Sequence, residues 1–156
     1  MPTIRNGSSQ TVEGGLEMLA EIRAGLIGTA SKLRLFQSTF NPTDQNVEAD
    51  FEAAEANFTG YAAVSITWAA PGIDPTDGAT MYGTRGLFVA SDAVAPNTIG
   101  GCWISTQTAA GPPAVNKSGQ YCVFNPPVPM TTALAQLFVT PVMLSDGSIG
   151  YFIQDN

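Results

Sequence analysis

The stretch YAAVSITWA, residues 61–69, decides the fold because its side chains alternate between two faces. Every second position from Ala62 to Trp68 is apolar, and the positions between them include Ser65 and Thr67. Alternation with a period of two is typical of a β-strand that is buried on one face. The stretch therefore predicts a strand with one side in a core.

Six other segments have a similar strand character. They are LRLFQS (33–38), MYGTRGLFVA (81–90), TIGGCWIST (98–106), QYCVF (120–124), AQLFVTPVML (135–144) and IGYFIQ (149–154). Segments rich in Pro, Gly and Asp lie between them and predict turns: PGIDPTDG (71–78), SDAVAPN (91–97), TAAGPPAVNKSG (108–119), NPPVPM (125–130) and SDGS (145–148).

Two of these signals also predict how strands are connected. Asp-Gly in SDGS favours a tight hairpin, because Gly readily adopts the positive φ that such a turn needs. Pro141 has no backbone N–H, so it predicts that its strand lies at a sheet edge or carries a bulge. About seven short strands without a βαβ alternation predict a mainly β protein, folded as an antiparallel β-sandwich or a jelly-roll-like barrel.

The N-terminal region departs from this pattern. In TVEGGLEMLAEIRAGLIG (11–28) the apolar residues recur at helical spacing, which predicts one amphipathic helix from about residue 12 to 24. Thr11 is the expected N-cap, and Gly25 with Gly28 is expected to end the helix. Residues 1–10 are polar and predict an arm, which leaves residues 11–156 as a single β-sandwich domain with strands from about residue 32.

An acidic segment precedes the alternating stretch of residues 61–69. VEADFEAAEANF (47–58) predicts a short helix with Val47, Phe51 and Phe58 on its packing side. Local runs of acids are most often solvated helix faces, so we expect these carboxylates on the surface. The acids are Asp44, Glu48, Asp50, Glu52 and Glu55.

Charge and hydropathy exclude several classes of function. The 156 residues carry a net charge of −7, from 13 acidic and 6 scattered basic residues. Binding to phosphates needs clustered Lys and Arg, so we expect no nucleic-acid partner. No apolar run reaches the roughly 18 residues of a membrane span, and the N-terminus lacks the apolar core of a signal peptide. The sequence thus predicts a soluble protein that is made in the cytoplasm and binds no membrane.

Catalytic chemistry has little support. The chain contains no histidine, the commonest general base and metal ligand. We therefore predict no catalytic residue, no metal site and no cofactor. The turn DPTDG (74–78) is expected to be a plain turn and not a cation site. The aromatic residues that a sugar-stacking platform would use are expected in the core or a subunit interface: Trp68, Trp103, Tyr82 and Tyr121.

The two cysteines, Cys102 and Cys122, fall nearly opposite each other if residues 98–106 and 120–124 form a hairpin. Because a cytoplasmic protein keeps its thiols reduced, we expect two buried thiols, with a disulfide as the alternative.

The segment of residues 33–62 resembles one in small bacteriophage virion proteins. There a strand ending in Leu-Phe (35–36) leads through a Pro turn (42) to an acidic helix (48–51), then to Phe-x-Gly-Tyr-Ala (58–62). NTIGGCWIST (97–106) and FNPPVPMTTALAQLFVTPVMLSDG (124–147) resemble later strands of the same family, so the likeness covers residues 12–150. The long loop TAAGPPAVNKSG departs from the family pattern.

The resemblance implies a non-enzymatic structural protein, with a capsid decoration (cement) protein as the first choice. Such proteins commonly sit as homotrimers on the capsid surface and clamp the major capsid protein, after assembly in the host cytoplasm. We expect the N-terminal arm and helix to make the contacts, through Ile4, Arg5, Leu16, Leu19 and Arg23. The alternative is a tail-associated receptor- or glycan-binding module with exposed aromatic residues such as Trp103 or Tyr82.

Overall fold

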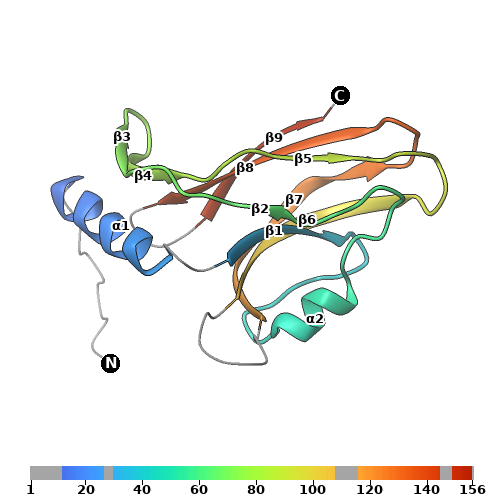
Figure 1. Cartoon of the computed structure of the whole chain (residues 1–156), viewed down its shortest axis with the longest axis horizontal. Helices are drawn as coiled ribbons and strands as arrows, with labels where there is room; N and C mark the ends of the chain where they lie inside the picture. Colours follow the sequence, from blue (N-terminus) through green and yellow to red (C-terminus); the bar gives the residue numbers. More distant parts are fainter. Residues whose placement is uncertain (1–11, 27–29, 108–115, 145–148, 156) are drawn as a thin grey trace, which may run out of the picture.

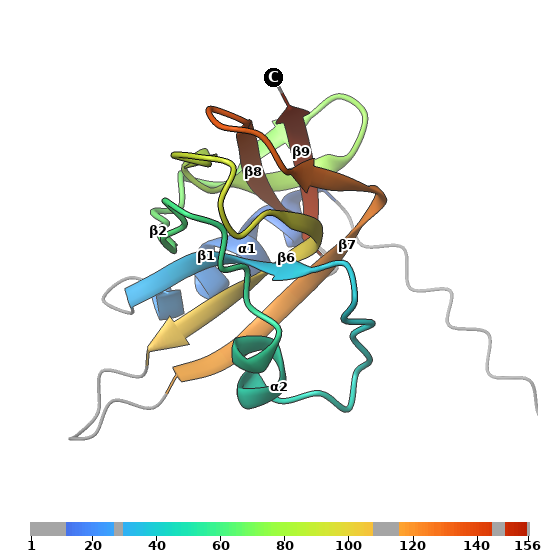
Figure 2. The same ribbon diagram turned by 90° about the vertical axis from the view of Figure 1, so that its right-hand side faces the viewer.

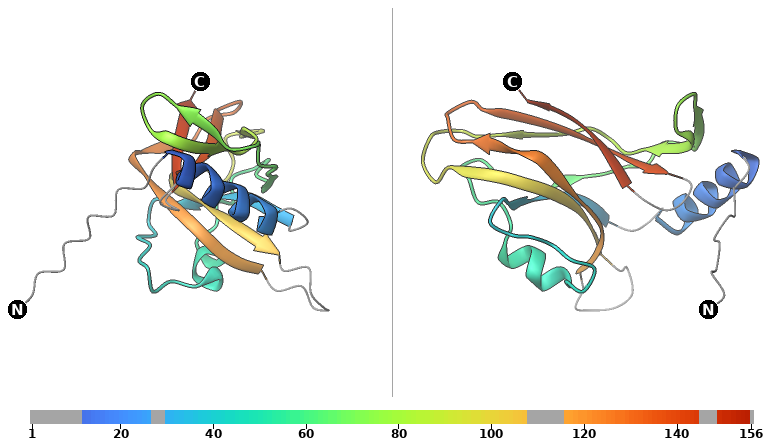
Figure 3. Two further views of the ribbon diagram at one scale, coloured as in Figure 1. Left: turned by 90° about the vertical axis from the view of Figure 1, so that its left-hand side faces the viewer. Right: turned by 180° about the vertical axis from the view of Figure 1, so that it is seen from behind.

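Two antiparallel sheets and two helices make up the computed structural model, which describes residues 12–26, 30–107, 116–144 and 149–155 (Figure 1). The sheets lie face to face, α1 (Val12–Leu26) lies at one end, and α2 (Glu48–Ala53) covers the outside of one sheet (Figure 3). The predicted mainly β class and the sandwich arrangement are confirmed.

The first sheet has the strand order β2-β1-β6-β7. Its strands are β1 (Ala30–Gln37), β2 (Val64–Ser65), β6 (Asn97–Gln107) and β7 (Asn116–Met130). The register of β1 and β6 places Arg34 opposite Trp103 and Leu35 opposite Cys102. Because directly opposed residues share a face, Arg34 and Trp103 lie on one side of the sheet and Leu35 and Cys102 on the other.

The second sheet is centred on β8 (Gln136–Leu144). On one side β8 pairs with β5 (Gly86–Val89) and β4 (Gly78–Tyr82), and on the other side with β9 (Ile149–Asp155). β3 (Gly72–Asp74) extends this sheet beside β4.

Alternation along β1 sends its side chains into two separate cores. Leu33 and Leu35 are fully buried between the two sheets, where they meet the inner faces of β4, β5 and β8. Phe36 points the other way and packs with Phe51 of α2 and Trp103 of β6 in a smaller outer core. Figure 2 shows the resulting succession of second sheet, first sheet and α2. The first sheet is thus buried on both faces where α2 lies against it.

The predicted strand over residues 81–90 is wrong as a single element, because β4 ends at Tyr82 and β5 begins at Gly86. Between them the Gly83 amide donates a hydrogen bond to the Pro141 carbonyl at 2.8 Å. A Cβ atom at Gly83 would lie 2.7 Å from the Pro141 side chain and 2.9 Å from that of Ile66. This close approach needs glycine and interrupts the strand.

The alternating stretch of residues 61–69 forms a shorter strand than predicted, since β2 covers only two residues. Its alternation persists beyond β2, however. Ile66 and Trp68 are buried while Ser65 and Thr67 are exposed, and Trp68 makes an isolated bridge to Gly83. The predicted burial pattern is thus confirmed for residues 64–68, but it is wrong at the start of the stretch, where Ala62 is exposed and Tyr61 packs against the main core.

The predicted break at NPPVPM is also corrected, because these residues form the last part of β7. Pro126 and Pro127 lie where the β6–β7 register shifts, between the pairs Gly101–Val123 and Ile99–Val128. β7 is an outer strand of its sheet, and a bulge in such a strand tolerates residues that cannot donate to the ladder.

Pro141 lies neither at an edge nor in a bulge of its own strand, so that prediction is wrong. β5 pairs with residues 136–139 and β4 with residues 142–144, which leaves a gap beside Pro141. The amide and carbonyl of one strand residue point to the same side, and the Pro141 carbonyl accepts from Gly83. The missing donor of Pro141 therefore faces the gap between β4 and β5.

Other predicted elements agree with the structure in part. α1 runs to Leu26, so Gly25 does not end it. β8 and β9 pair as a hairpin requires, and Cys102 lies opposite Cys122 as predicted. The turn SDGS, the arm (1–10), Thr11 and Gly28 lie outside the described residues. No helix in the described ranges is long and apolar enough to cross a membrane.

Candidate functional site

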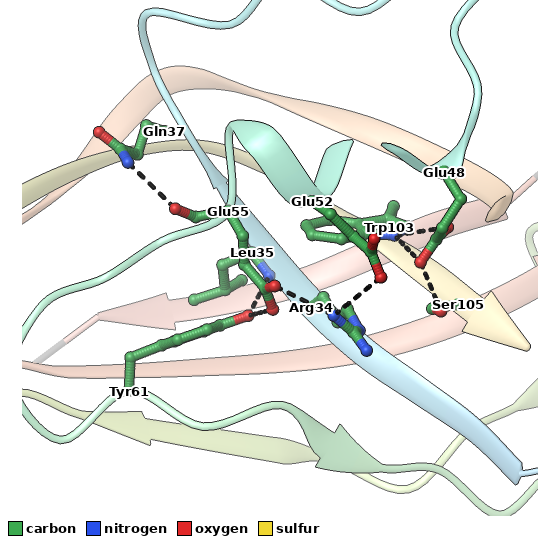
Figure 4. Close-up of polar contacts among 9 residues, drawn as sticks. All are labelled: Arg34, Leu35, Gln37, Glu48, Glu52, Glu55, Tyr61, Trp103 and Ser105. Carbon is green, nitrogen blue, oxygen red and sulfur yellow. Dashed lines mark hydrogen bonds and ion pairs between the residues drawn. The ribbon is translucent and has the colours of Figure 1, made fainter. Parts of the chain in front are cut away.

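A polar cluster lies between the α2 segment and the outer face of the first sheet (Figure 4). Its cation is Arg34, whose Nη1 lies 3.0 Å from Glu55 Oε2 and 3.9 Å from Glu52 Oε1. The same guanidinium lies 5.9 Å from the centre of the Trp103 ring. Arg34 thus joins β1 to the end of α2 and to the segment that follows it.

Both oxygens of the Glu55 carboxylate have partners within the chain. Oε2 accepts from Arg34, and Oε1 accepts from the Tyr61 hydroxyl at 2.7 Å. That hydroxyl in turn accepts from the Leu35 amide at 3.1 Å. Burial, partly offset by the Leu35 amide, raises the pKa of Tyr61, so the hydroxyl stays protonated and keeps donating to Glu55. Gln37 Nε2 also donates to the Glu55 backbone carbonyl at 3.0 Å.

Glu48, the first residue of α2, is buried with 8% of its surface exposed. Its carboxylate accepts from the Ser105 hydroxyl at 2.6 Å and from Trp103 Nε1 at 3.2 Å. Both donors come from β6, more than fifty residues away in the sequence. These hydrogen bonds from two uncharged donors offset part of the free-energy cost of burying the Glu48 carboxyl group.

The predicted solvated helix face is therefore wrong for Glu48 and Glu55. Both acids point at the sheet because α2 lies on its outer face, where Arg34, Trp103 and Ser105 supply donors. Val47, predicted to pack, is instead 60% exposed, whereas Phe51 and Phe58 are buried as predicted. The sequence does contain a signal for this contact: Arg34 on β1, and Trp103 and Ser105 on β6, stand at the strand positions that point away from the main core and carry hydrogen-bond donors.

A shallow pocket of about 540 Å³ lies beside this cluster. Its lining includes Gln37, Glu52, Glu55, Asn57 and Tyr61. For Glu55 to act as a general acid or base, it would have to give up its bonds to Arg34 and Tyr61. The arrangement is better suited to fastening the α2 segment to the sheet than to proton transfer.

Residues 74–78 form the turn of the β3–β4 hairpin, which confirms the predicted turn. Asp74 Oδ1 accepts from the amides of Thr76 at 2.8 Å and Asp77 at 3.1 Å, and Oδ2 accepts from the Tyr82 hydroxyl at 3.1 Å. These bonds lower the pKa of Asp74. The Thr76 amide has the largest effect, followed by the Asp77 amide and the Tyr82 hydroxyl.

The aromatic residues considered for sugar stacking are engaged inside the chain. Trp103 is fully buried, Trp68 is buried in the main core, and Tyr121 packs against the outer core. Tyr82 is half-buried, with its hydroxyl on Asp74. Core packing is confirmed for the two tryptophans.

The predicted contact residues of α1 pack largely against the chain itself. Leu19 is fully buried in the main core, and Leu16 is partly buried against it. Arg23 Nε donates to the Trp68 carbonyl at 3.0 Å. Ile4 and Arg5 lie outside the described residues, and a partner-binding role for any of the five stays a prediction.

Large apolar side chains are exposed at both ends of the sandwich. At the end formed by α1 and the β3–β4 hairpin, Val12, Met18 and Ile73 are exposed, Ile73 to 65% (Figure 1). At the opposite end the β5–β6 and β7–β8 loops expose Val94 and Leu134, the latter to 72%. Among the described residues, the strongly exposed large apolar side chains are all aliphatic or methionine.

The loops of the second end are fastened to one another by hydrogen bonds. Thr59 joins two loops, because its Oγ1 donates to the Val94 carbonyl at 2.8 Å and its carbonyl accepts from the Ser91 amide at 2.8 Å. The Leu134 amide also donates to the Ala90 carbonyl at 2.8 Å. The exposed side chains of this end are therefore presented by an ordered set of loops.

Comparison of the chain with protein-family models, with curated proteins and with solved structures gives no match.

Proposed function

We propose that this chain is a non-enzymatic structural protein of a bacteriophage virion, which binds the outside of the capsid and stabilises it. The virion assignment is supported by the resemblance of residues 12–150 to small phage virion proteins. The proposed partner is the major capsid protein, and the proposed assembly is a homotrimer on the capsid surface.

One observation carries the binding role: three acids that could serve catalysis are hydrogen-bonded within the chain, while large aliphatic side chains are exposed, several of them at its ends. Glu48, Glu55 and Asp74 each accept two or more hydrogen bonds from their own chain. Ile73 and Leu134, in contrast, leave most of their surface in water. Exposed aliphatic side chains suit a complementary apolar protein surface, whose burial favours association.

The end that carries α1 is the proposed capsid contact. Val12 and Ile73 are exposed there, next to the segment that leads into the predicted arm. An arm that becomes ordered on a partner adds contact area to a pre-folded domain. Leu19 belongs to the core of the chain, so in this proposal the exposed residues of this end take the contact role.

A tail-associated receptor-binding module is the second candidate, because the opposite end presents Val94 and Leu134 on hydrogen-bonded loops. Its glycan-binding form would need exposed aromatic rings. The burial of Trp103 and the Tyr82–Asp74 bond weigh against that form.

The copy number of this chain in the virion tests the proposal. Quantitative mass spectrometry against the major capsid protein should give hundreds of copies, in a simple ratio to the shell protein. A few copies to a few dozen would move the chain to the tail and favour receptor binding. Absence from purified particles would overturn both candidates.

The oligomeric state is a separate test. Light scattering of the purified chain should give about three times the chain mass of 16.3 kDa. A monomer that also stays single on isolated capsids would overturn the trimer while leaving capsid binding in place.

A further inference from the structure

The two cysteines of this chain face each other across neighbouring strands. Cys102 of β6 pairs with Cys122 of β7, in a regular stretch of three pairs between two register shifts. Directly opposed residues of an antiparallel pair have Cα atoms about 4.5–5.5 Å apart and side chains on the same face. A disulfide accepts Cα separations of about 4.4–6.8 Å. Both residues are free thiols here, at a backbone spacing that a disulfide would fit.

The surroundings of the two thiols differ. Cys102 is fully buried in the main core, whereas Cys122 is partly exposed. The hydroxyl of Tyr151, from β9, is buried beside Cys102, and no described atom meets the geometry of a hydrogen bond to it. Leu35 is the β1 residue opposite Cys102, and it is apolar. The described titratable groups that act on Cys102 are thus Cys122 and Tyr151.

We propose that Cys102 and Cys122 form an oxidisable dithiol that closes into a disulfide between β6 and β7. Cys122 is the attacking thiol because a reagent can reach it, and Cys102 is the resolving thiol. Tyr151 is a positioning residue, whose hydroxyl can donate a hydrogen bond to the thiolate of Cys102. This chemistry does not depend on the proposed function.

The oxidant is a small-molecule disulfide such as oxidised glutathione. The Cys122 thiolate attacks one sulfur, the glutathione disulfide breaks, and one glutathione thiolate leaves. Cys102 then loses its proton to water, and its thiolate attacks the Cys122 sulfur of the mixed disulfide, releasing the second glutathione. The two protein thiols lose two electrons and two protons, and oxidised glutathione becomes two reduced molecules.

The pH dependence follows from the thiolate requirement. Burial raises the pKa of Cys122, and burial followed by the charge of Cys122 raises the pKa of Cys102. Both thiolates are therefore scarce at neutral pH, so oxidation should be slow there and faster at alkaline pH. The Tyr151 hydroxyl acts in the opposite direction on Cys102 and lowers its pKa.

A time course of intact mass, with the full chain in oxidised glutathione, tests the proposal. The native chain should gain one glutathione briefly and end lighter by two hydrogen atoms, with a cross-linked peptide that joins Cys102 to Cys122. Native chain that ends with two glutathiones, or keeps one without closing, would overturn the proposal. Because this measurement uses the native chain, it does not depend on the folding of a variant.

Matched variants assign the roles of the two cysteines. Cys102→Ala should stop at one glutathione on Cys122, formed at the native rate. Cys122→Ala should react at least about tenfold more slowly, since its remaining thiol is buried. Equal rates in the two variants would overturn the order of attack. The thermal midpoint of each variant checks that it is folded.

Tyr151→Phe separates positioning from packing. It should leave the rate of glutathione addition unchanged and slow ring closure severalfold, with the slowing greatest near neutral pH. An unchanged rate of closure at every pH would remove Tyr151 from the proposal.

Discussion

Glu48 illustrates at the residue scale how a buried acidic side chain finds hydrogen-bond partners. We expect Glu48→Ala to lower the free energy of unfolding by about 1–3 kcal/mol, because Ser105 Oγ and Trp103 Nε1 would lose their acceptor in a buried site. Urea unfolding, followed by the intrinsic fluorescence of the two tryptophans, measures this loss. Glu21→Ala removes an exposed carboxylate of α1 and should change stability by less than about 0.5 kcal/mol. Equal losses in the two variants would contradict the role of Glu48.

Asp74 links one turn to the pH dependence of stability. Its pKa in the folded chain is lowered, so its contribution is present above the pKa of about 3.9 in the unfolded chain. The contribution is lost as the pH falls through the lower, folded pKa. Asp74→Asn should therefore lose less stability than the native chain between about pH 5 and pH 2.

Thermal midpoints of the native chain and Asp74→Asn across this range check the prediction. Asp77→Asn is the matched control, since it removes a charge from the same turn but leaves the three bonds to Asp74. The prediction fails if the control changes the pH profile as much as Asp74→Asn does.

The limits of sequence reasoning are also visible at the residue scale. The contact of Glu48 with Trp103 and Ser105 joins α2 to a strand more than fifty residues later. No local pattern contains such a contact, so the run of acids alone predicts a solvated helix face. The same reason applies to Glu55, because its partner Arg34 lies 21 residues before it in the sequence.

At the scale of elements, alternation predicts which side chains are buried better than it predicts the length of a strand. Along β1 the side chains alternate, since Leu33 and Leu35 enter the main core while Phe36 enters the outer core. Ile66 and Trp68 are likewise buried, as predicted. The interruptions were not predictable, because they depend on contacts between distant segments. Gly83 breaks a strand by approaching Pro141, which lies in another part of the chain.

Although α2 has only six residues, it is anchored to the first sheet through the outer core. Phe51 is buried against Trp103, with ring centroids 5.4 Å apart. The ring centroid of Phe40 lies 5.2 Å from that of Phe51. Phe51→Ala should therefore lower the free energy of unfolding by about 3–5 kcal/mol. Val47→Ala, one turn away and exposed, should lower it by less than about 0.5 kcal/mol.

Denaturant unfolding of both variants measures these differences. A small loss for Phe51→Ala would mean that α2 rests on the sheet without contributing to its stability. A large loss for Val47→Ala would mean that the exposed side chain has a partner in solution, such as a second copy of the chain.

At the scale of the whole molecule, the sandwich has exposed aliphatic side chains at both ends, and between the ends Glu48 and Glu55 are hydrogen-bonded to the first sheet and the segment beside it. In the proposed function the end with α1 faces the capsid and the opposite end faces away. Particles assembled without this chain provide the test, since purified protein can be added back to them. Ile73→Asp places a charge at the α1 end, and Leu134→Asp does the same at the opposite end, both on strongly exposed positions.

We expect Ile73→Asp to weaken binding to these particles by at least about tenfold, because it buries a carboxylate in an apolar contact. Leu134→Asp should bind as the native chain does, and a chain that begins at Val12 should keep its thermal midpoint but bind more weakly. Co-sedimentation with the particles measures all three. If Leu134→Asp fails to bind while Ile73→Asp binds normally, the loop end is the capsid contact and the proposed orientation is reversed. If neither variant affects binding, Ile73 and Leu134 have no part in the contact, and the chain that begins at Val12 then decides between the arm and the faces of the sheets.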